Sequence, residues 1–414
     1  MALGVVALLV GTFVLIRGGD RGRDVAGGSP SSIVASSTTT AAPTTTVAPT
    51  TTSTTAPTTT TSTTAPTTTT TAAPGPASFT VAMAGDLLPH LPVDRRAAEY
   101  GRASGRRYDF GPMLAPMQPV VAGADLAICH LEVPLAPDQG QISGYPSFGA
   151  PDELLDAVKD VGYDGCSNAS NHSLDRGRAG IDRTLAQMDA RGLRHAGTAR
   201  TAEEGAATTF YEVGGAKVAH LSYAYGFNGY SIPADAPFAA NQIDVARIRA
   251  DAALARRRGA ALVIVSLHWG EEYRSAPTAF QREVASALLP SPDIDVIVGH
   301  HAHVVQPIEQ VEGTYVVWGL GNQLSNQRTA PRADGLTVVL HAQKQPDGRY
   351  RISGIDAVPT YVEAGSMQVL PIVATLRAGG EPAALRAELE AAYDRTAAVL
   401  ATSPTPGVSL EPRP

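Results

Sequence analysis

One stretch near residue 300 constrains this chain more than any other. It is a largely apolar run that ends in three closely spaced histidines. Residues 294–298 have the character of a buried strand, which ends at Gly299. Three of the next four residues are His300, His301 and His303, although the whole chain has only 10 histidines. Imidazole is a common metal ligand, and α/β sheets place ligands at the carboxyl ends of their strands. The stretch therefore favours a metal site over a polar surface turn, provided that the rest of the chain supplies partners.

Four further predicted strands end in polar side chains that metals accept as ligands. Asp86 follows residues 79–84, Glu132 follows 125–129, Asn171 and His172 follow 163–167, and His268 follows 260–267. Taken singly, each has an ordinary alternative, such as a turn residue, a helix cap or a solvent-facing carboxylate. Because all of them occupy the same topological place, we expect one shared site. These ligands suit one or two divalent ions such as Mn, Fe or Zn, and Glu132 could bridge two ions.

The first 76 residues differ in composition from the rest. Residues 1–17 are a short apolar segment ending in Arg17, which predicts a membrane anchor or signal-anchor, although about 20 residues span a bilayer comfortably. Residues 18–76 are dominated by Thr, Pro and Ala and predict a disordered stalk. Arginines directly after an apolar segment favour a cytoplasmic location for the residues that follow, whereas a Thr- and Pro-rich stalk is typical of an exported protein. A start site upstream of Met1 would remove this conflict, because it would restore positive charge before the apolar segment. We expect a single-pass protein of the cell membrane with an extracellular folded domain.

The remaining sequence predicts one folded domain over residues 77–402 and a disordered tail at 403–414. The net charge of −7 argues against a nucleic-acid partner, because such proteins normally present a basic face. The two cysteines, Cys129 and Cys166, each lie near the end of a predicted strand. The sequence leaves open whether they form a disulfide, as an exported protein allows, or remain buried thiols.

Local signals predict further elements. Helices are expected at 151–161, 243–258, 278–289 and 382–400, and a hairpin at 208–223 with Gly214 and Gly215 in its turn. The aromatic loop at 223–238 is expected to line a substrate surface. The Gly-rich turn at 319–323 is only a weak sign of phosphate binding.

The order of short motifs along the chain resembles a known family. The motifs are Gly-Asp at 85–86, His-Leu-Glu at 130–132, Ser-Asn-His-Ser-Leu-Asp-Arg-Gly at 170–177, His-Trp-Gly-x-Glu-Tyr at 268–273, Gly-His-His-x-His-Val at 299–304 and Gly-Leu-Gly-Asn at 319–322. Over residues 79–358 this order is similar to the CapA family of poly-γ-glutamate capsule synthesis proteins, a branch of the calcineurin-like metallophosphoesterases. The resemblance implies an α/β fold in which two mixed β-sheets pack as a sandwich flanked by helices, with a two-ion site at the strand ends.

The resemblance also implies roles for individual residues. The implied metal ligands are Asp86, Glu132, Asn171, His268, His301 and His303. Among them, Glu132 takes the bridging position, and His301 and His303 ligate one ion each. The resemblance further implies that His172 is catalytic, as an acid for the leaving group or as a group that stabilises the oxyanion, and that Asp175 orients His172.

The sequence departs from the family pattern at Leu88, at His130 (Asn in the family's Asn-Leu-Glu) and at Ser170 (Asn in the family's Asn-Asn-His), and His300 lies beside the His-x-His pair. The wider phosphoesterase pattern has a histidine two residues after the first aspartate, where this chain has Leu88, so one ion loses a ligand unless His90 replaces it. His130 is expected to be either an added ligand or a hydrogen-bond donor to one. His300 is one residue out of register with the His-x-His pair and is expected to support the ligands.

These expectations combine into one function with two alternatives. We expect an extracellular, membrane-anchored, metal-dependent hydrolase that cleaves a phosphoester or an amide, with His172 as the acid. It would act on, or assist the synthesis or export of, an anionic cell-surface polymer such as poly-γ-glutamate. One alternative is a non-catalytic scaffold of the polymer synthase complex, which Leu88 favours. The other is a secreted phosphoesterase unrelated to capsule.

Overall fold

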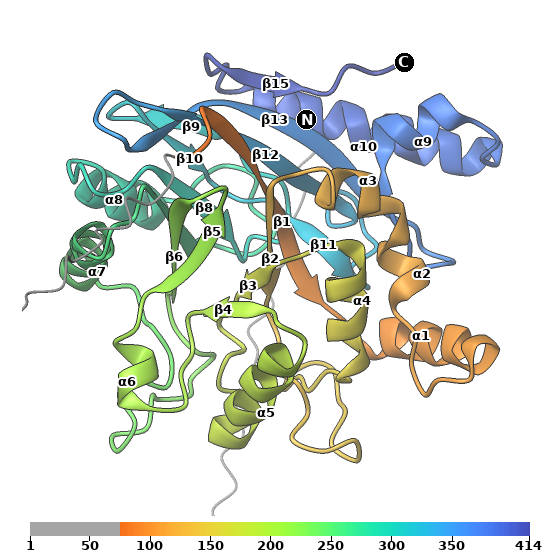
Figure 1. The fold of residues 1–414 in the computed structure, drawn as a ribbon. Helices are drawn as coiled ribbons and strands as arrows, with labels where there is room; N and C mark the ends of the chain where they lie inside the picture. The colour runs from red at the N-terminus through yellow and green to blue at the C-terminus, as the bar shows by residue number, and fades with distance from the viewer. Residues whose placement is uncertain (1–74) are drawn as a thin grey trace, which may run out of the picture. The chain divides into compact units, whose positions relative to one another are not determined.

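The computed structural model describes residues 75–414, and Figure 1 traces the path of the chain through them. The predicted anchor at residues 1–17 and nearly all of the predicted stalk lie outside the described residues. Between residues 75 and 414, no helix combines the length and the apolar character that crossing a membrane requires.

Two mixed β-sheets form the centre of the fold. The larger sheet contains β1 (Ser78–Leu88), β2 (Leu126–Leu131), β3 (Gly165–Ser167), β4 (Arg194–Ala196), β11 (Asn322–Ser325), β12 (Asp334–Lys344), β13 (Tyr350–Val362), β14 (Val369–Pro371) and β15 (Val408–Leu410). Its order is β14-β13-β12-β1-β2-β3-β4, with β11 beside β1 and β15 beside β13. The smaller sheet contains β5 (Thr209–Val213), β6 (Ala216–Ala224), β7 (Leu262–His268), β8 (Val296–His300), β9 (Ile308–Val311) and β10 (Thr314–Val317). Its order is β5-β6-β7-β8-β10-β9.

The main core lies between the two sheets because alternate residues of each strand face it. Phe79 and Val81 of β1 lie in this core together with Leu262 and Ile264 of β7. The intervening residue Val263 of β7 points the other way, under helices on the outer face. A strand that is buried on both faces is apolar at nearly every position, which is why the central strands could be predicted from the sequence.

Helices cover the outer face of each sheet (Figure 1). Helices α1 (Leu91–Ser104), α2 (Gly111–Leu114), α3 (Gln118–Val121), α4 (Glu153–Val161) and α5 (Gly177–Ala190) pack on the larger sheet. Helices α7 (Val245–Arg257) and α8 (Ala279–Leu288) pack on the smaller sheet, while α9 (Ile372–Ala378) and α10 (Ala383–Ala401) contact β13. The predicted sandwich of two mixed sheets flanked by helices is therefore confirmed.

The predicted hairpin is present, whereas the predicted disordered tail is wrong. Strands β5 and β6 pair antiparallel, and Gly214 and Gly215 both adopt positive φ in the turn between them. The tail forms β15, which pairs in parallel with residues 355–357 of β13. Because β14 pairs only with residues 360–362 of β13, that edge of β13 is open further along, and the tail fills it.

Candidate metal centre

The carboxyl ends of four strands bring buried polar side chains together. Asp86 and His130 are register partners on β1 and β2, and His268 and His300 are register partners on β7 and β8. All four side chains are almost completely buried. These strands continue further than predicted, so the four residues belong to the strands themselves and not to the loops that follow. The strand frame therefore fixes their backbone positions.

Two glycines allow the close backbone approach that this arrangement needs. A Cβ atom at Gly85 would lie 2.1 Å from the carbonyl oxygen of Gly321, and a Cβ atom at Gly299 would lie 1.9 Å from that of Trp318. Any side chain at either position would push the neighbouring segment away. Directly after Gly85, the backbone N–H of Asp86 donates to the Gly321 carbonyl at 2.9 Å, which anchors this end of β1.

Two buried carboxylates lie at the centre of the cluster. Asp86 Oδ1 is 3.2 Å from His300 Nδ1, and Asp86 Oδ2 is 3.3 Å from His303 Nδ1. Glu132 Oε1 is 3.6 Å from His303 Nε2 and 3.9 Å from His268 Nε2. Among residues 75–414, neither oxygen of Glu132 has a hydrogen-bond partner. Because an uncompensated carboxylate is costly at full burial, Glu132 lies where a bound cation would compensate its charge.

A chain of hydrogen bonds orients the histidines around these carboxylates. His268 Nε2 lies 2.9 Å from Asn171 Oδ1, and His268 Nδ1 lies 3.0 Å from His130 Nε2. The other ring nitrogen of His130 lies 2.8 Å from the Ser167 hydroxyl. The ring of His300 stacks on that of His130 with centroids 3.9 Å apart. His130 therefore sits inside the cluster, and His300 supports it from one side.

Burial keeps most of these imidazoles neutral. It lowers the pKa of His130 and of His268 well below the usual range, and it lowers the pKa of His301 to about 3. Neutral imidazole is the form that ligates a metal ion. The cluster thus presents its ring nitrogens in the state that an ion requires.

The carboxylates and His303 are coupled to one another. Burial raises the pKa of Glu132 well above its usual value. Burial would also raise the pKa of Asp86, but the neighbouring imidazoles of His300 and His303 hold it well below the usual range. For His303, burial lowers the pKa, yet Glu132 and Asp86 outweigh this and raise it to about 9. In the metal-free chain, a protonated His303 compensates part of the carboxylate charge.

Three non-glycine residues beside the cluster adopt left-handed backbone conformations. They are Tyr273, His301 and His303, with φ of 66°, 89° and 53°. The N–H of Tyr273 donates to the Ala302 carbonyl at 2.7 Å, so the two loops brace each other. Such conformations cost of order 1–3 kcal/mol each and cluster at functional sites. Backbone strain at these three positions is consistent with loops that hold their side chains toward the cluster.

The predicted contact between His172 and Asp175 is present. His172 Nδ1 lies 2.7 Å from Asp175 Oδ2, which also accepts a 2.7 Å hydrogen bond from the N–H of Phe148. The ring of Phe148 contacts that of His172 edge-on at 4.7 Å. Two interactions thus fix the ring of His172, while His172 Nε2 makes no hydrogen bond within the described part of the chain.

The assembled residues fit divalent ions. Three overlapping groups each bring ligand atoms within 4.8 Å of one another: Asp86 with His130 and His268, Asp86 with Glu132 and His303, and Glu272 with His301 and His303. The donor set of carboxylate oxygens and imidazole nitrogens suits Mn, Fe or Zn. The orphaned oxygens of Glu132 supply a second, independent sign that a cation belongs here. All predicted ligands lie in or beside this cluster, with Asn171 joined to it through His268.

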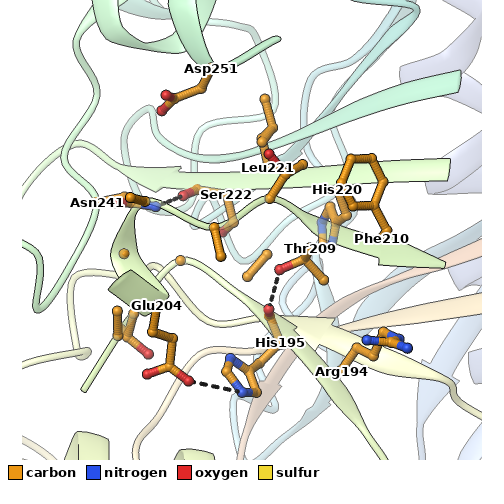
Figure 2. Close-up of a pocket in the computed structure, with 18 of the residues that line it drawn as sticks. Arg194, His195, Glu204, Thr209, Phe210, His220, Leu221, Ser222, Asn241 and Asp251 are labelled. Carbon is orange, nitrogen blue, oxygen red and sulfur yellow. Dashed lines mark hydrogen bonds and ion pairs between the residues drawn. The ribbon is translucent and has the colours of Figure 1, made fainter. Parts of the chain in front are cut away.

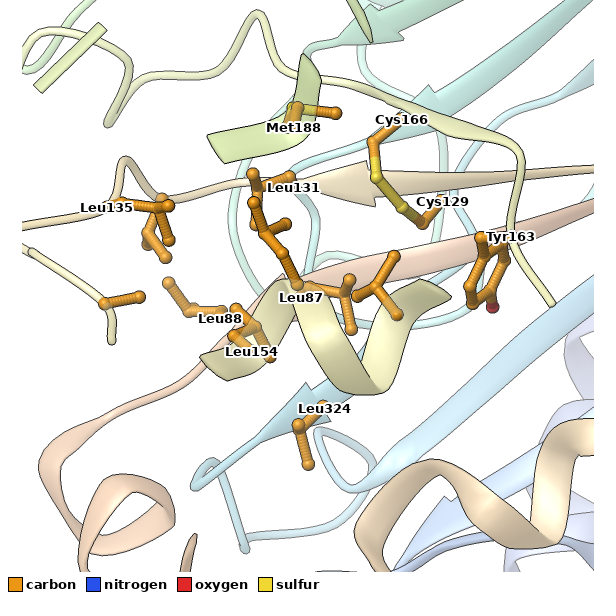
Figure 3. Close-up of a cluster of buried hydrophobic side chains, with 14 of the residues drawn as sticks. Leu87, Leu88, Cys129, Leu131, Leu135, Leu154, Tyr163, Cys166, Met188 and Leu324 are labelled. Carbon is orange, nitrogen blue, oxygen red and sulfur yellow. A yellow bond between two sulfur atoms is a disulfide. The ribbon is translucent and has the colours of Figure 1, made fainter. Parts of the chain in front are cut away.

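Leu88 cannot contribute to the site, as expected. Its side chain is buried in the apolar cluster that also contains Leu87 (Figure 3). His90 does not replace it in any of the three ligand groups. Instead, His90 Nδ1 lies 3.0 Å from the Leu88 carbonyl oxygen and 3.4 Å from the backbone nitrogen of Asn326. The ligand group of Asp86 is completed by His130, the alternative that the sequence left open.

The open question about the cysteines is also resolved. Cys129 and Cys166 are register partners on β2 and β3 and form a disulfide, which Figure 3 shows beside the apolar cluster. The residues that follow them, His130 and Ser167, are the hydrogen-bonded pair described above. The covalent link therefore joins the two strands directly beneath the site.

Sequence reasoning gave no ligand role to two residues that the structure places at the site. Asn322 Oδ1 lies 3.0 Å from His303 Nδ1, and Glu272 belongs to a ligand group with His301. Both residues lie in motifs that carry the family resemblance, Gly-Leu-Gly-Asn and His-Trp-Gly-x-Glu-Tyr. The motifs therefore marked both residues, but the contact of Asn322 with His303 could not be predicted, because it depends on β11 lying beside β1.

A cavity of 560 Å³ lies elsewhere, at the edges formed by β4 and β5 (Figure 2). Its lining includes His195, Glu204 and Asp251. Glu204 is ion-paired with Arg200, and Asp251 with Arg247 at 3.4 Å. None of the three ligand groups lines this cavity. Since Glu204 and Asp251 are already paired and no ligand group lies here, the strand-end cluster is the better candidate for the functional site.

Fold and site together define a two-sheet α/β protein with a buried carboxylate–histidine cluster of the kind that binds divalent ions. The comparison with known families agrees with the motif order: the family described as "Bacterial capsule synthesis protein PGA_cap" matches residues 80–327. The chain belongs to this family.

Two curated relatives carry capsule-related names. The chain is 30% identical over 237 residues to the PGA biosynthesis protein CapA of Bacillus subtilis, covering 54% of this chain and 60% of that protein. It is 26% identical over 294 residues to the capsule biosynthesis protein CapA of Bacillus anthracis, covering 69% and 68%. The match thus leaves a large part of each relative's own length without a counterpart here.

Solved structures show a more distant likeness. The calcineurin-like phosphoesterase YfkN of Bacillus subtilis aligns with 13% identity and a TM-score of 0.39, covering 77% of this chain and 98% of that one. A 5'-nucleotidase precursor from Thermus thermophilus aligns with 15% identity and a TM-score of 0.40, covering 78% and 59%. Similarities at this level do not establish a shared activity.

Proposed function

We propose that this chain is a metal-dependent hydrolase of cell-surface polymer metabolism. The observation that carries the proposal is Glu132, a fully buried carboxylate whose two oxygens have no hydrogen-bond partner among residues 75–414. It lies between His268 and His303, in one ligand group with Asp86. A carboxylate that serves two ions at once is the central ligand of two-metal hydrolases.

Under this proposal, one set of residues holds the ions and another handles the proton of the leaving group. Asp86, Glu132, Asn171, His268, His301 and His303, joined by His130, would hold two ions of Mn, Fe or Zn. When bound, such ions polarise the phosphoester or amide group to be cleaved and stabilise charge on its oxygens. Asp175 fixes His172 through Nδ1, which leaves His172 Nε2 available to deliver a proton to the leaving group.

The substrate that we propose is an anionic cell-surface polymer such as poly-γ-glutamate, or an intermediate held by the synthase complex that makes it. Membership of the capsule synthesis family and the names of the two relatives support this proposal. The apolar segment and the stalk predicted from the sequence support a membrane-anchored protein with its folded domain outside the cell. The disulfide between Cys129 and Cys166 also supports an oxidising compartment.

One observation favours a second candidate, a non-catalytic scaffold of the synthase complex. Leu88 lies in the apolar cluster, so the position that carries a histidine in the wider pattern supplies no ligand. A centre that holds one ion, or holds it weakly, would keep a structural role without hydrolysis. His130 argues against this candidate, because it completes the ligand group of Asp86.

The test combines metal analysis with hydrolysis assays on the full chain. We expect the protein purified after Mn or Fe supplementation to contain bound metal and to cleave an aryl phosphodiester or poly-γ-glutamate. His303→Ala should lose most of the metal. His341→Ala is the matched control, since His341 pairs with Asp356 on the exposed side of β12. Absence of metal in the wild type would overturn the proposal, and metal without hydrolysis of either substrate would favour the scaffold. Cleavage of the phosphodiester alone would point to a phosphoesterase unrelated to capsule.

A further inference from the structure

Residues 326–332, which we call the arginine loop, follow β11 and are tied to the metal centre by hydrogen bonds. Asn322, whose Oδ1 contacts His303, donates from Nδ2 to Gln327 Oε1 at 3.3 Å and to the Arg332 carbonyl at 2.9 Å. Gln327 Nε2 in turn lies 3.4 Å from the hydroxyl of Tyr273. The position of the arginine loop is therefore set by the same residues that orient His303.

Arg332 is the cation that this loop brings to the centre. Its guanidinium carbon lies 3.6 Å from the centroid of the Tyr273 ring, and that ring lies 6.0 Å from the ring of His303. Arg332 is half-buried, and within the described residues its side chain forms neither an ion pair nor a hydrogen bond. Nearby Arg274, by contrast, pairs with Glu271 at 3.0 Å.

The stacked geometry leaves the hydrogen-bonding edge of Arg332 free. A guanidinium carries its five N–H donors in its own plane, so stacking on Tyr273 fixes the plane without using a donor. Tyr273 is itself held in a left-handed conformation by its hydrogen bond to Ala302 and is 40% exposed. The chain thus maintains a strained backbone and an unpaired cation at the rim of the cluster. Arg176, by contrast, uses its side-chain donors on the backbone carbonyls of Ser147 and Phe148.

We propose that Arg332, held on Tyr273, binds a second anionic group of the substrate, a carboxylate or a phosphate that is remote from the bond being cleaved. This inference rests on the proposed function, because it concerns the same centre. The planar guanidinium of arginine matches the paired oxygens of a carboxylate and of a phosphate. It would therefore favour a substrate that carries such an anion at this position over one that carries a neutral group there. A substrate with repeated anionic groups would place one at the ions and the next at Arg332.

The first test measures binding without hydrolysis. The metal-free full chain is titrated with glutarate, with inorganic phosphate and with neutral glutaramide, and binding is followed by ligand-observed NMR. Losing a charge-assisted, bidentate contact should weaken binding about tenfold or more. We therefore expect Arg332→Gln to bind one or both anions about tenfold more weakly and glutaramide unchanged. Arg328→Gln, an exposed residue of the same loop, is the matched control and should bind as the wild type does. Equal losses in both variants would overturn the assignment.

The second test uses three aryl phosphodiesters with the same leaving group, whose other arm ends in a methyl, a carboxylate or a phosphate. In the metal-loaded protein, Arg332→Gln should lower the kcat/KM of a charged-arm probe relative to the methyl probe about tenfold. The arm affected identifies the anion. Arg332→Lys keeps the charge and should restore part of this ratio. A lysine variant no better than the glutamine variant, or an equal loss on all three probes, would overturn the proposal.

The outcomes of the two tests distinguish a failure of the proposed function from a failure of the anion site. If the wild type hydrolyses no probe while Arg332→Gln still loses anion binding, the hydrolase function fails and the anion site stands. If hydrolysis is present but neither the binding nor the probe ratio depends on Arg332, the hydrolase stands and the anion site fails. Thermal unfolding of each variant confirms that the comparison is made on folded protein.

Discussion

Replacing Glu132 with glutamine gives the sharpest test of the metal centre. The change keeps the size of the side chain but removes a charge whose two oxygens lack hydrogen-bond partners among residues 75–414. Because burial raises the pKa of Glu132 well above its usual value, glutamine mimics the protonated side chain in the metal-free protein, and the melting temperature should stay equal or rise. With metal, the variant loses the central ligand. Stability and metal binding are thus expected to move in opposite directions.

The size of the metal effect follows from linkage. An ion present at 100 times its dissociation constant stabilises the folded state by about 2.7 kcal/mol. For roughly 340 folded residues, the unfolding entropy is about 0.7 kcal/mol per kelvin, so this stabilisation raises the melting temperature by about 4 °C. If Glu132→Gln weakens binding about 100-fold, the same ion concentration contributes only about 0.4 kcal/mol, and the shift falls below about 1 °C.

The assay is calorimetric unfolding of the chelator-treated full chain with and without MnCl₂. Glu283→Gln, on the exposed face of α8, is the matched control and should show the full wild-type shift. An undiminished Mn²⁺ shift in Glu132→Gln would refute the ligand assignment. So would a metal-free variant that melts several degrees below the metal-free wild type, because the contact with His303 would then stabilise the buried Glu132 without an ion.

Three further predictions concern residues outside the ligand groups. Burial raises the pKa of Asp94 from 3.8 to about 8, so the stability that its neutral form contributes is complete below pH 3.8 and is lost as pH rises toward 8. Asp94→Asn should flatten this decline, which amounts to up to about 6 kcal/mol in denaturant titrations across that range. Replacing Cys129 and Cys166 with alanine opens a link between residues 37 apart and should lower the free energy of unfolding by about 4 kcal/mol, again measured with denaturant. Asp175→Asn should lower kcat on an aryl phosphodiester about tenfold while leaving the metal content unchanged, because Asp175 positions His172 without joining a ligand group.

The sequence located the site because its ligands follow a topological rule. Parallel strands present their carboxyl ends at the same edge, so polar residues at the ends of β1, β2, β7 and β8 could be expected to meet. The apolar runs that mark these strands are strong because both faces are buried. The exact strand ends were missed because apolar character stops before pairing does: β1 continues through Asp86 by pairing with β11.

Other features depended on contacts that no local pattern encodes. The disulfide requires Cys129 and Cys166 to be register partners, which strand spacing alone does not determine. The role of His130 depends on His268 arriving from the other sheet at 3.0 Å. The tail forms β15 only because β13 offers an open edge to it. In each case the deciding neighbour lies far away in the sequence.

The centre spans the boundary between the two sheets, and this decides what metal binding can add to stability. Asp86 and Glu132 come from the larger sheet and the loop after β2, while His268 and His303 come from the smaller sheet and the loop after β8. Without metal, the two sides are already joined, because the carboxylates raise the pKa of His303 to about 9 and hold it as a cation beside them. A bound ion therefore takes the place of a protonated imidazole that compensates only part of the carboxylate charge. The Mn²⁺-induced shift measures the difference between these two cations, which is why a shift of a few degrees is expected and not a transition from an unfolded to a folded chain.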